Sequence, residues 1–222
     1  MVNSNPQFKP CPLCNNNRAR HYYHCTRSLT DYFSCPACEL IFVPAVFHLS
    51  PEDERAIYDQ HNNDPGDPRY RAFLNRLAAP VISRLTSKPA KGLDFGSGPG
   101  PTLSSLFETA GHECANFDKF YANDTSALKT NYDYICSSEV IEHLRDPAAT
   151  LHMLFSILRP KGILGIMTKL YYKEQEFAGW YYKNDPTHIA FYSEKTMHFI
   201  ADKYNKTAVI IEPDIVLFQS PD

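Results

Sequence analysis

The last part of the chain alternates short apolar runs with segments of helical period. The helical periods lie at Thr102–Ala110, Ala148–Leu158 and Ser193–Tyr204. Such alternation is typical of an α/β fold with a mostly parallel sheet and helices on both faces. Only Pro213 and Asp214 separate the last two strands, so we expect the C-terminal strand to be antiparallel. The apolar runs predict strands over Gly92–Phe95, Glu113–Phe117, Tyr132–Cys136, Ile163–Thr168, Thr207–Glu212 and Ile215–Gln219.

A helical segment precedes this region. Ser50 and Pro51 predict one helix start, as N-cap and first helical residue, and Asp67 and Pro68 predict a second. The second helix contains Pro80, where we expect a bend. Its apolar positions fall on one face, which consists of Phe73, Leu74, Leu77, Ala78, Val81, Ile82 and Leu85.

The first residues of the chain show no sustained helical period. They are rich in cysteine, aromatic and polar residues, and short strands fit at Tyr32–Ser34 and Leu40–Val43. The pattern therefore divides the chain into three parts. These are a small N-terminal domain over residues 1–47, a helical linker over 48–87 and an α/β domain over 88–222.

Composition and charge exclude several classes of protein. Hydrophobic residues make up 43% of the 222 residues and charged residues 21%, which is ordinary for a globular protein. No apolar run approaches the roughly 18 residues that a membrane helix needs, and the first residues do not resemble a signal peptide. We therefore expect a cytoplasmic protein without a membrane segment. The net charge of −3 provides no global attraction to nucleic acid.

Four of the seven cysteines form two C-x-x-C pairs, CPLC with Cys11 and Cys14, and CPAC with Cys35 and Cys38. This spacing predicts a zinc ribbon in which four thiolates complete a tetrahedron. A segment of about 45 residues has too little core to fold alone, so the metal would supply folding free energy. Four thiolates leave no open coordination position, so we expect the zinc to be structural. Alternative ligands between the pairs are His21, His24 and Cys25.

The stretch LDFGSGPGP forms a glycine-rich loop between a strand and a helix. Its glycines allow a sharp turn and close approach of a ligand. However, Asp94 precedes the first glycine by two residues and would repel a phosphate group, and no G-K-[ST] follows. A positively charged nucleoside without phosphate, such as S-adenosylmethionine, fits better. Asp94 would favour its ammonium group, and the N–H groups of Gly96, Ser97 and Gly98 would serve its carboxylate.

The next strand ends in Asp118, 22 residues after Gly96, where an acid would bind the ribose hydroxyls. At this point the sequence resembles the class I S-adenosylmethionine-dependent methyltransferases, in particular the small-molecule branch that includes ubiquinone-biosynthesis O-methyltransferases. The resemblance covers residues 88–220. Its motifs occur in order as LDFGSGPG, FDKF, YDYICSSEVIEHLRDP, LRPKGILGIMT and DPTHIAFYS.

The resemblance implies a Rossmann-like sheet and a set of cofactor contacts. Gly96 and its neighbours would contact the methionine part and Asp118 the ribose, while Ser138 follows the fourth strand where the family contacts the cofactor. Arg76 loosely matches a family arginine near the methionine carboxylate. Only about 14 residues separate Asp118 from the next strand, so we expect the third strand to be reduced or missing. This departure leaves the adenine contacts unassigned.

Two histidines are candidates for catalysis, because imidazole can accept a proton near neutral pH. His143 lies in VIEHL after the fourth strand, and His188 lies in DPTHIAFYS, where we expect the acceptor pocket. Each histidine has an alternative role in packing or hydrogen bonding, and we expect Glu142 to anchor its loop. Trp180, Tyr181 and Tyr182 either line that pocket or pack on their own domain.

The sequence therefore predicts a zinc ribbon joined to a methyltransferase that uses S-adenosylmethionine. Net acidity and the motifs favour a small-molecule acceptor. RNA is the second option, in which Tyr22, Tyr23, Tyr32 and Phe33 of the ribbon, with three arginines, would stack on bases instead of forming a small core. A third option is a non-catalytic adaptor that binds cofactor and uses the ribbon to bind a partner. The pattern indicates neither the methylated atom nor an oligomeric state.

Overall fold

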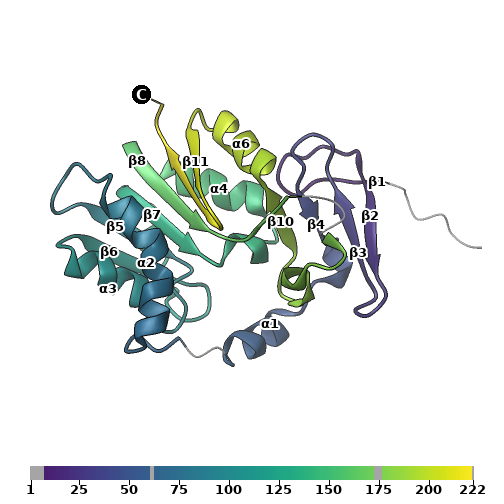
Figure 1. Ribbon diagram of the computed structural model, residues 1–222, viewed down its shortest axis with the longest axis horizontal. Helices are drawn as coiled ribbons and strands as arrows, with labels where there is room; N and C mark the ends of the chain where they lie inside the picture. Colours follow the sequence, from purple (N-terminus) through teal and green to yellow (C-terminus); the bar gives the residue numbers. More distant parts are fainter. Residues whose placement is uncertain (1–7, 61–62, 173–176, 222) are drawn as a thin grey trace, which may run out of the picture.

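The computed structural model describes residues 8–60, 63–172 and 177–221 of the chain. Its main sheet has the strand order β11-β12-β8-β7-β5-β6 (Figure 1). The pairs β5–β6, β5–β7 and β7–β8 are parallel, whereas β12 is antiparallel to both β8 and β11. This arrangement confirms the predicted α/β fold with its antiparallel C-terminal strand. The strand bounds are Lys91–Phe95 for β5, Glu113–Phe117 for β6, Tyr132–Ser138 for β7, Leu158–Met167 for β8, Thr207–Ile211 for β11 and Ile215–Gln219 for β12.

The prediction that the third strand is reduced or missing is also confirmed. Between β6 and β7, all residues are described, and they form only an isolated bridge from Asp118 to Ala122 and the 3-10 helix η2 at Ala127–Lys129. A connection this short cannot hold a strand flanked by two helices. Strand β6 therefore forms the edge of the sheet.

Helices cover the two faces of the main sheet. Helices α2 (Pro68–Ile82) and α3 (Thr102–Thr109) pack on one face, and α4 (Pro147–Ser156) and α6 (Glu194–Lys203) on the other. The strands present alternate residues to the two cores, so that Tyr134 and Cys136 face α2 while Ile135 faces α4. Burial on both faces explains why the centre of β7, Tyr134–Cys136, is apolar without alternation.

The predicted helix starts occur as expected. Ser50 caps α1 (Pro51–Tyr58) by accepting a hydrogen bond from the Asp53 N–H, and Asp67 caps α2 by accepting one from the Arg69 N–H. Pro80 lies in the last turn of α2, which ends two residues later. Among the described residues, no helix is both long and apolar enough to cross a membrane.

A second sheet joins the N-terminal strands to two strands from the later part of the chain. Its strand order is β1-β2-β3-β4-β10-β9, so the N-terminal strands continue into strands that precede α6 (Figure 1). The sequence pattern divides the chain near residue 47, yet the sheet crosses that position. The bounds are Phe8–Lys9 for β1, Ala19–Cys25 for β2, Thr30–Ser34 for β3, Ile41–Phe42 for β4, Leu170–Tyr171 for β9 and Ala190–Ser193 for β10. The 3-10 helices η1, η3 and η4 span Ala45–Phe47, Ile141–His143 and Tyr181–Asn184.

Candidate functional site

A cavity of about 420 Å³ opens at the carboxyl ends of β5, β6 and β7. Ligands in open α/β sheets bind at this edge. Two predicted cofactor residues, Asp94 and Arg76, are not part of its lining. The other candidate cofactor and catalytic residues are brought together in its wall, namely Gly96, Ser97, Gly98, Asp118, Ser138, His143 and His188.

The glycine loop forms one end of the cavity. Gly96 and Gly98 have positive φ angles of 82° and 63°, which side chains rarely adopt. A Cβ atom on Gly96 would lie 2.3 Å from Cγ2 of Val140. The N–H groups of Gly96 and Ser97 donate to the Phe117 carbonyl oxygen at 2.7 and 3.2 Å. The turn is therefore tightly packed against the next strand, and only glycine fits at its start.

Asp118 closes the end of β6 beside this loop. Its Oδ2 accepts a hydrogen bond from the Gly98 N–H at 3.0 Å. Its Oδ1 accepts two more, from the N–H groups of Phe120 at 2.8 Å and Tyr121 at 3.1 Å. The carboxylate is thus fixed by the backbone, while the residue still lines the cavity.

Asp94 lies behind the loop at the end of β5 and is 3% exposed. Burial, together with the nearby charge of Asp118, raises the pKa of Asp94 to about 7. Among the residues that the structure describes, none forms a hydrogen bond or an ion pair with this carboxyl group. A buried carboxylate without a partner is unfavourable, so a cation bound in front of it would stabilise its charged form.

Arg76, which the sequence places loosely near the methionine carboxylate, does not line the cavity. Its guanidinium donates to Oδ1 of Asp214, in the turn between β11 and β12. Asp214 is 1% exposed, and a buried carboxylate needs such a partner. Helix α2 instead contributes Tyr70 and Phe73 to the cavity wall. Periodicity marks Phe73 as part of the apolar face, but it does not reveal that this end of the face is open to a ligand.

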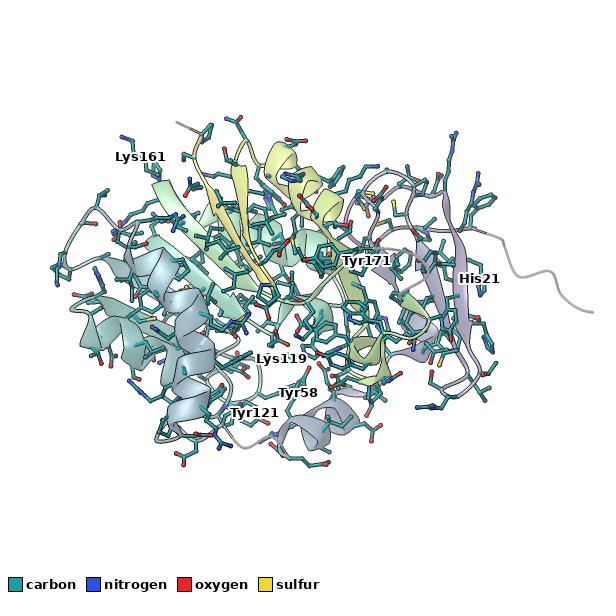
Figure 2. All side chains as sticks on the ribbon, in the orientation of Figure 1. His21, Tyr58, Lys119, Tyr121, Lys161 and Tyr171 are labelled. Carbon is teal, nitrogen blue, oxygen red and sulfur yellow. The ribbon has the colours of Figure 1, made fainter. Side chains whose placement is uncertain are left out.

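Helix α1 covers the cavity from the other side. Tyr58 of α1 lines the cavity, and Tyr121 donates to Oδ1 of Asp59 at 2.6 Å. Lys119 donates to Oε1 of Glu54 at 2.7 Å. Figure 2 shows Tyr58, Lys119 and Tyr121 close together beside α1. These residues were missed at the sequence level, apart from the acidic motif that contains Lys119, since only folding brings α1 over the sheet.

Aromatic rings beside Asp118 supply candidate contacts for a nucleobase. Phe95 and Phe117 are stacked with centroids 5.5 Å apart and planes 15° apart, and both line the cavity with Phe120. Flat apolar rings suit the face of an adenine. They occupy the region for which the shortened connection left no predicted contact.

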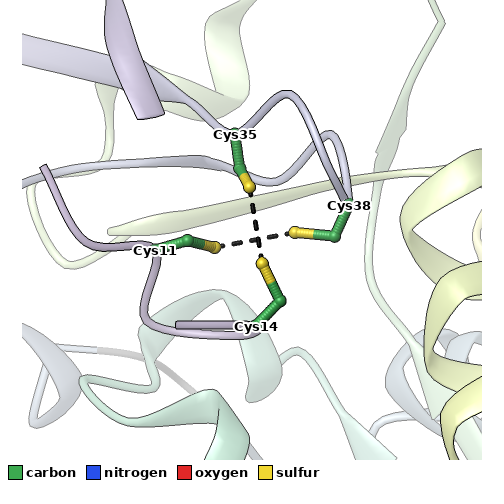
Figure 3. A group of neighbouring side chains, drawn as sticks. All are labelled: Cys11, Cys14, Cys35 and Cys38. Atoms are coloured by element: carbon green, nitrogen blue, oxygen red, sulfur yellow. Dashed lines mark hydrogen bonds between the residues drawn. The ribbon is translucent and has the colours of Figure 1, made fainter. Parts of the chain in front are cut away.

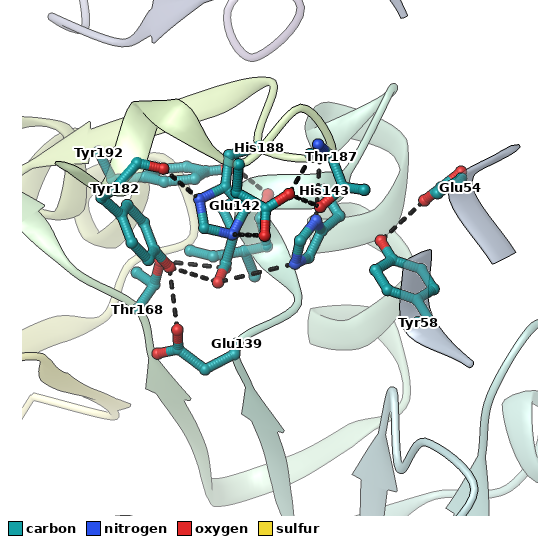
Figure 4. A network of polar contacts seen from close by, with 12 residues as sticks. Glu54, Tyr58, Glu139, Glu142, His143, Thr168, Tyr182, Thr187, His188 and Tyr192 are labelled. Carbon is teal, nitrogen blue, oxygen red and sulfur yellow. Dashed lines mark hydrogen bonds and ion pairs between the residues drawn. The ribbon is translucent and has the colours of Figure 1, made fainter. Parts of the chain in front are cut away.

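The two candidate catalytic histidines meet in the cavity wall (Figure 4). The rings of His143 and His188 have centroids 4.8 Å apart. Nδ1 of His143 faces the Thr187 carbonyl oxygen at 3.0 Å, and Nδ1 of His188 faces the Tyr182 carbonyl oxygen at 2.6 Å. A carbonyl oxygen only accepts, so each Nδ1 carries the proton and each Nε2 keeps its lone pair. Burial lowers the pKa of both imidazoles and favours this neutral form.

Glu142 lies beneath the histidine pair and is fully buried. Its Oε1 accepts from the Tyr182 hydroxyl and its Oε2 from the Thr168 hydroxyl at 3.0 Å (Figure 4). Burial raises the pKa of Glu142, and burial with the charge of Glu142 raises that of Glu139 to about 8. Tyr182 is buried in this network and does not line the cavity, so its ring packs on its own domain.

The same cluster has the composition of a metal site. One ligand atom each from Glu142, His143 and His188 lie within 4.8 Å of one another. Two imidazoles and a carboxylate are a common ligand set for divalent transition metals. Because His143 and His188 also line the cavity, a cation held here would face the ligand space.

The four predicted zinc ligands converge on one point (Figure 3). The Sγ atoms of Cys11 and Cys38 are 3.6 Å apart, and those of Cys14 and Cys35 are 3.4 Å apart. Tetrahedral zinc with bonds of about 2.3 Å requires sulfur separations of about 3.8 Å, so the thiols fit this ion. The alternative ligands lie elsewhere: His21 and His24 bond to Asp31, and Cys25 is outside the group.

Comparison with known proteins gives a consistent result. Residues 67–209 match a family model described as a methyltransferase domain. The fold is similar to that of the magnesium protoporphyrin IX methyltransferase of Synechocystis PCC 6803 with bound SAH, with a TM-score of 0.54. The two sequences are 12% identical, and the match covers 79% of this chain and 97% of that chain. It is also similar to the 1,6-didemethyltoxoflavin-N1-methyltransferase of Burkholderia thailandensis, with a TM-score of 0.57 and 13% identity over 91% and 99%. At these identities the likeness concerns the fold alone. A search of curated protein sequences finds no match.

Proposed function

We propose, since the chain belongs to the family of methyltransferase domains, that it transfers the methyl group of S-adenosylmethionine to a small-molecule acceptor. The observation that carries this proposal is the single cavity between the glycine loop and the histidine pair. One end has the groups that suit a cationic nucleoside, and the other has groups that suit a nucleophile. Transfer between two bound molecules requires such a shared space.

At the cofactor end, each residue has a distinct part. The backbone of Gly96 and Gly98 approaches the methionine portion closely, and Asp118 is placed to accept from the ribose hydroxyls. Ser138, at the end of β7, faces the same space. Asp94 balances the ammonium group from behind the loop, directly or through water. Arg76 is not part of this proposal because it pairs with Asp214.

At the acceptor end, the histidines position and deprotonate the nucleophile. When bound, S-adenosylmethionine supplies a methyl group on a sulfonium; its C–S bond breaks with the electron pair staying on sulfur as the bond to the acceptor forms. The lone pair on Nε2 of His143 or His188 takes the acceptor's proton. The hydrogen bonds at Nδ1 hold both rings in the tautomer that this step needs. The walls would hold the two reactants in line.

A divalent cation at Glu142, His143 and His188 would occupy the same nitrogen lone pairs. Titration with Mn²⁺, followed by electron paramagnetic resonance on zinc-loaded protein, separates the two roles. One tight site that disappears in His188→Ala assigns these nitrogens to a metal. Absence of Mn²⁺ binding to protein that carries one zinc per chain would leave these nitrogens free for proton transfer.

Small molecules are favoured over RNA as acceptors by charge and burial. The net charge is −3, and two of the four ribbon aromatics that could stack on bases are buried, with Tyr32 3% and Phe33 7% exposed. The other two, Tyr22 and Tyr23, are partly buried. An RNA enzyme would form salt-dependent complexes with tRNA or rRNA fragments. No measurable binding at low salt would eliminate this alternative.

The function is tested by calorimetry with S-adenosylmethionine, followed by turnover assays on pools of small hydroxyl, amine and carboxyl compounds. We expect binding and formation of S-adenosylhomocysteine with at least one pool. Binding without turnover on any pool would instead support the adaptor. Failure to bind the cofactor at all would refute the proposal.

For the N-terminal segment, we propose a structural zinc ion at Cys11, Cys14, Cys35 and Cys38. Support comes from the convergence of the four sulfur atoms and from the burial of three of the four cysteines. Four thiolates at this spacing require a cation to remain charged. Metal analysis of purified protein should give one zinc per chain, reduced to none in Cys35→Ser.

A further inference from the structure

The four-cysteine ribbon (residues 8–43) shares a sheet with the segment that carries His188. Strand β4 pairs with β10 in antiparallel register, with Phe42 opposite Ala190 and Ile41 opposite Phe191. These strands are far apart along the chain but adjacent in the structure (Figure 1). Paired strands supply each other's backbone hydrogen bonds. Loss of order in β4 would therefore disturb β10 directly.

One residue links the ribbon to the catalytic cluster. The carbonyl oxygen of Ile189 accepts from the Val43 N–H at 2.8 Å, and the Ile189 N–H donates to the Glu142 carbonyl oxygen at 2.8 Å. Ile189 follows His188 directly. The backbone beside the histidine is therefore held from one side by the ribbon and from the other by the loop that contains Glu142 and His143.

Aromatic packing reinforces this link. Tyr32 of the ribbon packs against Phe177 and Phe191, with ring centroids 5.2 and 5.8 Å apart. Its hydroxyl donates to the Lys183 carbonyl oxygen at 3.3 Å. Tyr32 thus contacts the segment 177–193 near its start, its middle and its end.

The cofactor end is built differently. Gly96 and Gly98 follow β5, and Asp118 follows β6, and these strands pair only within the main sheet. The loop is closed by its own bonds to Phe117 and Asp118. Within residues 8–60, 63–172 and 177–221, no backbone hydrogen bond joins the ribbon to this end, so loss of order in the ribbon has no such route to it.

We infer that the metal-bound ribbon is a positioning element for the acceptor end of the cavity. Through β4 and Tyr32 it holds the segment 177–193, and thereby His188, in place. The cofactor end does not depend on it. The ribbon would then have a role in the proposed active site, in addition to its own metal-dependent folding.

Trp180 provides a direct readout, since it is the only tryptophan of the chain and lies in this segment. Its ring packs against Tyr182 at 5.2 Å and Phe191 at 6.0 Å. Two perturbations test the inference on the full chain: removal of the metal with a chelator, and Tyr32→Leu, which leaves all four thiols intact. Tyr204→Leu is the matched control, because Tyr204 stacks on Phe155 at 4.2 Å, outside the ribbon and the segment.

Both perturbations should shift the Trp180 emission to longer wavelength and accelerate hydrogen exchange at the Ile189 amide by about tenfold or more. Exchange at the Gly96 and Gly98 amides should stay within about twofold, as expected for sites without shared partners. Adding zinc back should reverse the effect of the chelator, and the control variant should change neither signal. Once an acceptor is identified, Tyr32→Leu should raise the KM for the acceptor and leave the KM for S-adenosylmethionine unchanged.

Unchanged Trp180 emission and Ile189 exchange under both perturbations would overturn the inference. Equal acceleration at Ile189 and Gly98 would also overturn it, since that would mean general unfolding. The emission and exchange readouts use neither cofactor nor acceptor. They therefore decide the inference even if the proposed methyl transfer proves wrong.

Discussion

Replacement of Asp94 by asparagine tests the cofactor end of the site most directly. The variant keeps the shape of the side chain and removes its charge. In the wild-type protein, burial raises the pKa of Asp94 from 3.8 to about 7. Since each pH unit of such a difference corresponds to about 1.4 kcal/mol, ionising this group in the free folded protein costs about 4 kcal/mol.

The sign of the effect on stability follows from proton release. The unfolded chain loses this proton near pH 3.8 and the folded protein near pH 7, so the free energy of unfolding falls as pH rises between these values. Asparagine does not ionise, so Asp94→Asn should not show this fall in the free energy of unfolding. Without cofactor, the variant should therefore be more stable than wild type above pH 7, by an amount on the order of a few kcal/mol.

Cofactor binding should show the opposite preference. A cationic ligand favours ionised Asp94, whose fraction rises between pH 6 and pH 8, so wild-type affinity should rise about tenfold over this range. Calorimetric Kd values for S-adenosylmethionine at several pH values provide the measurement. The titration of the ligand's own groups affects its binding to both proteins in the same way. In Asp94→Asn it should be the only source of pH dependence. Identical pH dependence in wild type and Asp94→Asn would refute the argument that Asp94 faces the cation.

Three further substitutions probe the cavity and its support. Asp118→Ala removes charge-assisted hydrogen bonds to the ribose and should weaken S-adenosylmethionine binding about 10- to 100-fold in calorimetry. Circular dichroism should show that the fold is retained. Unchanged affinity would refute the ribose role of Asp118. Gly96→Ala should lower the free energy of unfolding by about 1–3 kcal/mol in urea titrations, because a Cβ atom would lie 2.3 Å from a neighbouring side chain. Gly179→Ala is its control, with no atom within 4 Å, and an equal loss there would contradict the packing argument. Tyr182→Phe leaves the buried carboxylate of Glu142 with one hydroxyl donor fewer and should cost about 1–3 kcal/mol of stability; a variant as stable as wild type would show that the bond contributes little.

Local pattern was enough to predict most strands and helices of the α/β domain. The predicted bounds of β6 and β12 agree with the structure at both ends, and α3 differs only in its last residue. The prediction succeeded because each segment carries its own signal: an apolar run of strand length, a helical period, or a capping residue such as Ser50. The missing strand followed from chain length alone, since too few residues separate Asp118 from β7.

The candidate site was predictable where its residues sit beside a local signal. Gly96, Gly98 and Asp118 mark the ends of strands, so parallel pairing brings them to one edge. The ion pair of Arg76 with Asp214 could not be predicted, because a helical period gives a face but not the distant residue that the face meets. The cofactor contact of Arg76 stays a prediction.

Sequence alone was enough to predict where the chain turns, which face of α2 is apolar, and which four thiols could share a metal. Tertiary structure alone decided that α1 covers the cavity, that His143 meets His188 above Glu142, and that β4 pairs with β10. The reason is the range of the interactions. Turns, caps and amphipathic faces are set by neighbours a few residues away, whereas contacts between distant segments depend on how whole surfaces pack, which no single stretch of sequence records.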